Sequence, residues 1–318
     1  MGVTMNKKVA VLMSTYNGER YLEEQIQSII NQSYKNWILY IRDDGSKDST
    51  VNIIEKYTDH YDNIVFFNKN RVKNVGVVKS FMELLANVKA DYYMFSDQDD
   101  VWLENKIKNS VDKLSKNEPG PVCVFTDVEI VNQDLAPVRR MNGSKVCTDF
   151  ISLLFTNYVT GCTMLFNDEL KSLIKFNQIN YQNIFMHDWW IGLLASAFGK
   201  LVYLDEATML YRQHSDNVVG SNKKNTLPRI IYRLTHLDQE RANVKRVVNI
   251  AYEFSREYPS SLEGKQQLYI DKYAALTDKS SISNNLKLVM KLVPQRLNPK
   301  GKVFFSYLLV VFHNDFLK

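Results

Sequence analysis

Residues 91–102 read DYYMFSDQDDVW, an apolar run followed closely by three carboxylates in four positions. The carboxylates are Asp97, Asp99 and Asp100, and they stand where a strand through residues 92–96 would end. Because carboxylates this close repel one another, a hard divalent cation such as Mg²⁺ or Mn²⁺ would stabilise them. The alternative is a solvated acidic turn that caps a helix starting near Val101, since Asp suits turns and N-caps. These residues alone do not decide between a metal site and a turn.

The first hundred residues alternate between strand-like and helical patterns. Strand-like runs occupy residues 9–14, 37–42, 64–68 and 92–96, and helical segments occupy residues 21–32, 49–61 and 76–88. Such alternation predicts an α/β fold with a mainly parallel central sheet flanked by helices. Sheets of this kind bind ligands beyond the carboxyl ends of their strands.

Polar clusters follow three of these four runs. Residues 14–17 (STYN) follow the first, residues 43–46 (DDGS) the second and residues 97–100 (DQDD) the fourth. Three clusters on one edge of a sheet predict a site large enough for a nucleotide. Turn chemistry and helix capping are the alternative, and residues 46–50 (SKDST) are expected to cap a helix. Capping does not explain why two carboxylates, Asp43 and Asp44, are adjacent.

The pattern changes twice along the rest of the chain. Residues 122–132 and 158–167 read as strands, residues 187–199 as an apolar helix, and residues 200–212 as one or two further strands. Beyond residue 218 the chain is helix-rich and basic, with 17 Lys and Arg against 8 Asp and Glu, a net charge of +9. We therefore expect a first domain over residues 1–217, with halves at about 8–115 and 116–217, and a helical, basic region over residues 218–318. The boundary is expected at 218–226.

Composition indicates an ordinary folded protein, because 45% of the 318 residues are hydrophobic and 24% are charged. The cysteines Cys123, Cys147 and Cys162 form no Cys-x-x-Cys pair, so neither a zinc site nor a disulfide framework is expected. No export signal is apparent at the N-terminus. The longest C-terminal apolar run has ten residues, at 303–312, whereas a spanning helix needs ~20. These features predict a cytoplasmic protein.

Two nucleotide-binding motifs are missing. No Gly-x-Gly-x-x-Gly follows the first strand, and no Gly-Lys-Ser/Thr occurs, so neither a dinucleotide fold nor an ATPase-type phosphate loop is supported. A nucleotide would have to be held by carboxylates and a cation. A carboxylate at the second strand end can accept hydrogen bonds from a pyrimidine N–H or a ribose hydroxyl.

Four blocks in order carry a resemblance to a known family. Residues 14–19 (STYNGE), 43–50 (DDGSKDST), 74–76 (NVG) and 97–102 (DQDDVW) resemble a family 2 glycosyltransferase with the GT-A fold. Within that family, residues 97–103, 187–190 (HDWW) and 211–220 (YRQHSDNVVG) are most similar to bacterial rhamnosyltransferases of cell-wall and capsule polysaccharide assembly. The resemblance implies an inverting, metal-dependent sugar transfer with dTDP-L-rhamnose as the donor.

The resemblance also implies roles for individual residues. Donor contacts are implied for Ser14, Tyr16, Asp43, Asp44, Asn74, Asp97 and Gly161. The residues implied to hold Mn²⁺ or Mg²⁺ are Asp97, Asp99 and His214, and Asp100 could replace either aspartate. Asp188 matches the catalytic base, and acceptor contacts are expected at Trp102, Trp189 and Arg212. The alternatives are a helix N-cap for Asp188, a structural hydrogen bond for His214, a strand bulge for Gly161 and core packing for the tryptophans.

The acceptor and the partners are expectations of the same kind. No Gln-x-x-Arg-Trp motif is present, which disfavours a processive synthase. We expect a saccharide acceptor, lipid-linked, reached by a basic and aromatic C-terminal region at the inner face of the cell membrane. No nucleic-acid partner is expected, and a homodimer is left open.

Other functions would account for parts of the sequence. A UDP-linked hexose or N-acetylhexosamine is the alternative donor. The alternative enzyme class is a metal-dependent phosphohydrolase or nucleotidyltransferase, which would leave Asp188 without a role. A basic nucleic-acid or membrane binding module would leave the acidic first half unexplained.

Overall fold

The computed structural model describes residues 7–142, 146–213, 237–279, 282–294 and 299–317. The chain divides into two compact units. The first unit consists of residues 1–148, 158–176 and 187–220, and the second of residues 149–157, 177–186 and 221–318. The domain boundary expected at residues 218–226 lies outside the described residues.

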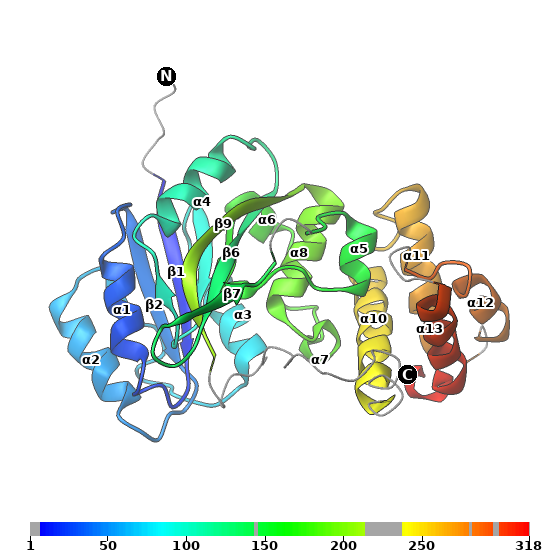
Figure 1. Cartoon of the computed structure of the whole chain (residues 1–318), viewed down its shortest axis with the longest axis horizontal. Helices are drawn as coiled ribbons and strands as arrows, with labels where there is room; N and C mark the ends of the chain where they lie inside the picture. Colours follow the sequence, from blue (N-terminus) through cyan, green and yellow to red (C-terminus); the bar gives the residue numbers. More distant parts are fainter. Residues whose placement is uncertain (1–6, 143–145, 214–236, 280–281, 295–298, 318) are drawn as a thin grey trace. The chain divides into compact units, whose positions relative to one another are not determined.

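One mixed sheet forms the centre of the first unit (Figure 1). Its strands, in spatial order, are β3 (Ile64–Phe66), β2 (Trp37–Asp43), β1 (Val9–Thr15), β4 (Tyr92–Ser96), β8 (Met164–Asn167), β6 (Val122–Val131), β9 (Lys200–Arg212) and β5 (Val101–Trp102), with β7 (Pro137–Arg140) paired to β6. Strands β1 to β4 run parallel to their neighbours within this group, whereas β8 lies antiparallel between β4 and β6. The parallel group brings the carboxyl ends of β1, β2 and β4 to one edge.

Helices flank this sheet and complete the core of the first unit. They are α1 (Leu22–Ile30), α2 (Thr50–His60), α3 (Val77–Asn87), α4 (Lys106–Ser115), α6 (Asp168–Ser172) and α8 (His187–Phe198), and a 3₁₀ turn covers Gly161–Thr163. In α1 the side chains of Leu22, Ile26 and Ile29 share one face and are fully buried. Burial of such a face, more than helix propensity, stabilises a short helix.

Two expectations differ from the structure. The strand expected over residues 158–167 is confined to β8, because residues 161–163 form the 3₁₀ turn. The helix expected near Val101 was wrong, since Val101 and Trp102 form β5 and the helix begins at Lys106. Val101 pairs with Leu210 and Trp102 with Met209, more than a hundred residues later in the chain, so the local pattern could not reveal this strand.

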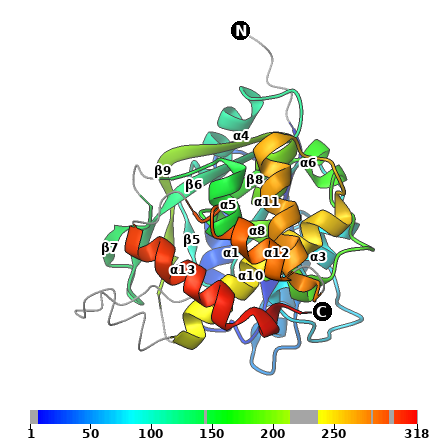
Figure 2. The same cartoon turned by 90° about the vertical axis from the view of Figure 1, so that its right-hand side faces the viewer.

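The second unit is helical, as expected for a basic C-terminal region. Its helices are α5 (Phe150–Phe155), α7 (Tyr181–Ile184), α10 (Leu237–Glu257), α11 (Gly264–Ala274), α12 (Ile282–Val289) and α13 (Pro299–Val311) (Figures 1 and 2). The ring of Phe155 meets the rings of Tyr269, Tyr273 and Phe305 edge-on. No helix in the described ranges is both long and apolar enough to span a bilayer.

Candidate active site

Side-chain hydrogen bonds join the loops that follow β1, β2 and β4. The side chain of Gln98 accepts from the backbone N–H of Tyr16 at 2.8 Å and donates to its carbonyl at 3.0 Å. Thr15 Oγ1 donates to Asp43 Oδ1 at 3.1 Å, and the N–H of Asn17 donates to Ser46 Oγ at 2.8 Å. The three polar clusters therefore share one edge of the sheet, as the sequence predicted.

The carboxylate of Asp43 is fully engaged within the protein. Its Oδ1 accepts from Thr15 Oγ1 and Ser46 Oγ, and its Oδ2 accepts from the N–H groups of Gly45 and Ser46, both at 2.8 Å. A carboxylate offers about four acceptor positions, so these four bonds occupy all of them. Asp43 thus shapes the turn after β2.

Asp44 ties the end of β2 to the start of α3. Its Oδ1 accepts from Arg42 at 2.8 Å and from the N–H of Val75 at 2.7 Å, and its Oδ2 accepts from the N–H of Gly76 at 3.0 Å. One acceptor position remains on Oδ2. These bonds also bring the exposed residue Asn74 close to Gly45. A Cβ added to Gly45 would lie 3.4 Å from the backbone nitrogen of Asn74.

Ser14 and Tyr16 lie at the accessible side of this edge. Ser14 Oγ lies 2.7 Å from Ser80 Oγ, and Ser80 in turn accepts from Arg42 at 3.1 Å. The side chain of Tyr16 is 47% exposed. Both residues are therefore within reach of a ligand at the strand ends.

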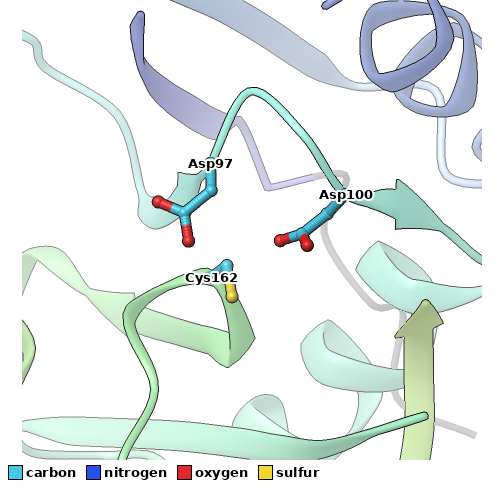
Figure 3. Close-up of side chains that lie close together, drawn as sticks. All are labelled: Asp97, Asp100 and Cys162. Atoms are coloured by element: carbon cyan, nitrogen blue, oxygen red, sulfur yellow. The ribbon is translucent and has the colours of Figure 1, made fainter. Parts of the chain in front are cut away.

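Asp97, Asp100 and Cys162 form one cluster, which Figure 3 shows from close range. Asp97 follows β4, Asp100 precedes β5 and Cys162 lies in the 3₁₀ turn before β8. Their ligand atoms all lie within 4.8 Å of one another. Asp100 is 1% exposed, and its Oδ2 has no hydrogen-bond partner among the described residues. An orphaned, buried carboxylate oxygen beside a second carboxylate fits a divalent cation.

Charge repulsion and burial act together on this cluster. Burial, and next the charge of Asp99, raise the pKa of Asp97 to about 7. The same two causes raise the pKa of Asp100 well above its ordinary value. Lys106 is completely buried, and burial lowers its pKa to about 8. A cation bound here would relieve repulsion that the protein alone leaves in place.

The predicted base, Asp188, borders the same cluster. It lies in the first turn of α8, and its Oδ2 accepts from the N–H of Gly161 at 2.9 Å. The charge of Asp188 contributes to the raised pKa of Asp97. A Cβ on Gly161 would lie only 2.9 Å from His187 Nε2, so glycine permits this close approach. The Gly161 loop, Asp188 and the carboxylate cluster are therefore neighbours.

The residues expected to contact the acceptor are buried. Trp102 is 3% exposed, and Lys106 Nζ lies 5.0 Å from the centre of its ring. Trp189 is also buried. The guanidinium of Arg212 donates to the carbonyl of Asp99 at 2.9 Å, and this bond helps to hold the loop of residues 97–100 in place. The guanidinium also donates to Glu24. His214 lies outside the described residues.

Sequence reasoning gave no role to three residues of the site, namely Cys162, Lys106 and His187. Cys162 directly follows the glycine that the resemblance marks, which is the only local signal for it. Lys106 stands in a helix with an amphipathic pattern, where a lysine is ordinarily solvated. The ring of His187 packs between Phe81 and Phe95, with ring centres 4.4 and 4.6 Å away, and burial lowers its pKa to about 3.

Comparison with known proteins indicates the same family as the sequence motifs. The model of the family "Glycosyl transferase family 2" matches residues 10–198. RfbG of Shigella flexneri, a dTDP-rhamnosyl transferase by name, is 36% identical over 218 residues, which make up 66% of this chain and 74% of RfbG. TuaG of Bacillus subtilis, assigned by name to teichuronic acid biosynthesis, is 26% identical over 68% of this chain and 82% of its own length.

Solved structures are similar in fold. TarS residues 1–349 from S. aureus, in complex with UDP-GlcNAc, align with a TM-score of 0.63 and 17% identity over 97% of this chain and 89% of that one. The mannosyltransferase PcManGT from Pyrobaculum calidifontis, in complex with GDP-Man and Mn²⁺, aligns with a TM-score of 0.51 and 13% identity over 98% and 87%. The expected fold, a GT-A sheet with flanking helices and a helical C-terminal region, is confirmed.

Proposed function

Because the chain belongs to glycosyl transferase family 2, we propose that it moves L-rhamnose from dTDP-L-rhamnose onto a saccharide acceptor with inversion at the anomeric carbon. The observation that carries this proposal is the meeting, at one edge of the sheet, of the Asp97 and Asp100 carboxylates with Asp188. A metal-binding pair and a base side by side are what an inverting transfer from a nucleotide diphosphate requires.

A divalent cation, Mn²⁺ or Mg²⁺, would be held by Asp97 and Asp100. The orphaned oxygen of Asp100 and its closeness to Asp97 favour this pair over the pair of Asp97 and Asp99. Asp99 adds negative charge to the same site. When bound, the cation neutralises charge that develops on the departing diphosphate. The role of His214 as a further ligand remains a prediction from the resemblance.

The donor nucleotide would lie over the ends of β1 and β2. Asp44 is the better candidate for a hydrogen bond from the base or ribose, because one acceptor position remains on its Oδ2 while Asp43 uses all of its positions. Asn74, Ser14 and Tyr16 border the same space. The donor contact of Gly161 stays a prediction from the resemblance, since the side chains of His187 and Asp188 lie where its Cβ would stand.

Asp188 would act as the general base. Its carboxylate takes the proton of the acceptor hydroxyl while that oxygen attacks the anomeric carbon and the bond to the diphosphate breaks. The hydrogen bond from the Gly161 N–H to Oδ2 fixes the orientation of the carboxylate. Trp189 follows Asp188 in α8 but is buried, and its acceptor contact stays a prediction from the resemblance.

The rhamnosyl donor is supported by the name of RfbG, which is 36% identical over two thirds of this chain. A UDP-sugar transferred by the same chemistry is the alternative. A panel of nucleotide sugars, assayed for acceptor-dependent release of nucleoside diphosphate with and without Mn²⁺ or Mg²⁺, separates them. We expect dTDP-L-rhamnose to be turned over fastest and chelation to stop release. Release of nucleotide without any acceptor would instead indicate a phosphohydrolase.

The acceptor is proposed to be a lipid-linked saccharide, reached at the inner face of the cell membrane. Helix α13 carries an exposed apolar face made of Val303, Tyr307, Val310 and Val311, of which Val303 is 71% exposed. Residues 282–318 contain six Lys and Arg and one acidic residue. Apolar side chains beside an excess of positive charge suit an anionic lipid surface.

A further inference from the structure

Cys162 forms a cluster with the carboxylates of Asp97 and Asp100, and it has no role in the proposed reaction. Its Sγ lies within 4.8 Å of ligand oxygens of both Asp97 and Asp100, and its side chain is 1% exposed. In Figure 3 the side chain of Cys162 lies beside the carboxylates of Asp97 and Asp100. The chain's other cysteines, Cys123 and Cys147, are not in this cluster.

The surroundings of Cys162 depend on whether a cation is bound. In the cation-free structure the Cys162 thiol hydrogen-bonds to Asp97. A thiol that binds a metal loses its proton. The S–H bond is then replaced by an S–metal bond, and the proton passes to solvent.

A second observation points to a ligand at this position. Asp100 Oδ2 is buried and has no hydrogen-bond partner among the described residues, although it belongs to the same cluster as the thiol. A cation bound by the two carboxylates would have both this oxygen and the sulfur of Cys162 as ligands. Oxygen-only sites favour hard cations, whereas a thiolate favours softer ones such as Zn²⁺ or Cd²⁺.

We propose that Cys162 is a ligand of the cation held by Asp97 and Asp100, so that the site is a mixed carboxylate and thiolate centre. This inference rests on the proposed cation site. Its consequence is selectivity: Mn²⁺ and thiophilic cations bind better, relative to Mg²⁺, than at a site made of oxygen ligands alone.

Titration of the full-length protein with Cd²⁺ tests this directly. A cadmium–thiolate bond gives an ultraviolet charge-transfer band, which is independent of enzyme activity. We expect the band in the wild type and in a Cys123→Ala/Cys147→Ser variant, in which Cys162 is the remaining cysteine. The variant Cys162→Ser should lack the band and bind Cd²⁺ about 10-fold more weakly or worse, while Mg²⁺ binding changes little.

The possible outcomes separate this inference from the proposed function. Mn²⁺ binding that depends on Asp97, without a cadmium–thiolate band in the wild type, would overturn the role of Cys162 and leave the cation site standing. A band that persists in Cys162→Ser would also overturn it, because another thiol would be the ligand. If Mn²⁺, Mg²⁺ and Cd²⁺ all failed to bind, with and without donor, this would contradict both the role of Cys162 and the proposed cation site. A thermal melt of Cys162→Ser confirms that the variant is folded.

Discussion

The unpartnered oxygen of Asp100 distinguishes this aspartate from its neighbour Asp99. In the cation-free protein the charged form of Asp100 is disfavoured by burial and by two nearby carboxylates. Asp100→Asn should therefore raise the free energy of unfolding at pH 8, because the amide places no charge in this buried site. The same variant should lose the stabilisation that Mn²⁺ gives to the wild type.

Asp99→Asn is the matched control for this measurement, because it removes a carboxylate from the same loop. Urea unfolding of both variants with and without Mn²⁺ compares them. We expect Asp99→Asn to retain most of the cation-dependent stabilisation. If Asp99→Asn abolished it and Asp100→Asn kept it, the cation would be held by Asp97 and Asp99, as the family resemblance implies.

His187 predicts a specific dependence of stability on pH. Its pKa is about 3 in the folded protein, against the ordinary value of 6.5, because burial disfavours the charged ring. Between these values the unfolded chain binds a proton that the folded protein does not, so stability falls as pH falls from about 6.5 toward 3. His187 contributes at most about 1.4 kcal/mol per pH unit to this slope.

Urea unfolding of the wild type and of His187→Gln at several pH values between 4 and 8 measures the contribution. The variant lacks the titrating ring, so its stability should fall less steeply below pH 6.5. Equal slopes for the two proteins would show that His187 can take up a proton in the folded state.

At the level of elements, the link between the end of β2 and the start of α3 depends on one side chain. Asp44 accepts from buried Arg42 and from two backbone N–H groups. Asp44→Ala would leave the buried guanidinium without this partner and both N–H groups unpaired. We expect a loss of about 3 to 5 kcal/mol in the free energy of unfolding, the usual cost of breaking a buried ion pair. Asp59→Ala, at an exposed position of α2, is the control and should cost under about 0.5 kcal/mol.

The parallel half of the sheet could be predicted from local patterns, and the rest could not. Strands β1, β2 and β4 are bounded by polar turns and separated by amphipathic helices. The apolar face of such a helix is visible in the sequence, as the helical spacing of Leu22, Ile26 and Ile29 shows for α1. Strand β5 has two residues and exists because it pairs with β9. Strand β8 lies antiparallel between β4 and β6, and this order depends on partners far apart in the sequence.

The site shows the same division. Asp43, Asp44, Asp97 and Asp188 were found because acidic residues at strand ends and in family motifs are visible in the sequence. Which oxygens are free to bind was not visible, since Asp43 is occupied by its own turn and Asp100 is orphaned. Arg212 and Trp102 read as binding residues, but their burial depends on the packing of β5 and β9.

At the scale of the whole molecule, the exposed apolar face of α13 predicts binding to anionic membranes. Val303→Asp/Val310→Asp should lower the fraction bound to vesicles of phosphatidylserine and phosphatidylcholine by about 10-fold or more, because it removes apolar contact and adds negative charge. Sedimentation with vesicles measures this fraction. Leu268→Asp, at another exposed apolar position of the second unit, is the control. An equal vesicle-bound fraction for the wild type and both variants would contradict the proposed role of α13.

The most direct test of the central claim compares the wild type with Asp188→Asn in acceptor-dependent release of dTDP from dTDP-L-rhamnose, with donor affinity measured in parallel. Asparagine keeps an oxygen that can accept from the Gly161 N–H but cannot take a proton from the acceptor. Transfer should fall by about 10²- to 10⁴-fold, the usual contribution of a general base, while the donor Kd stays within about 3-fold. Transfer that survives in Asp188→Asn, or donor binding that is lost together with transfer, would contradict the assignment of Asp188 as the base.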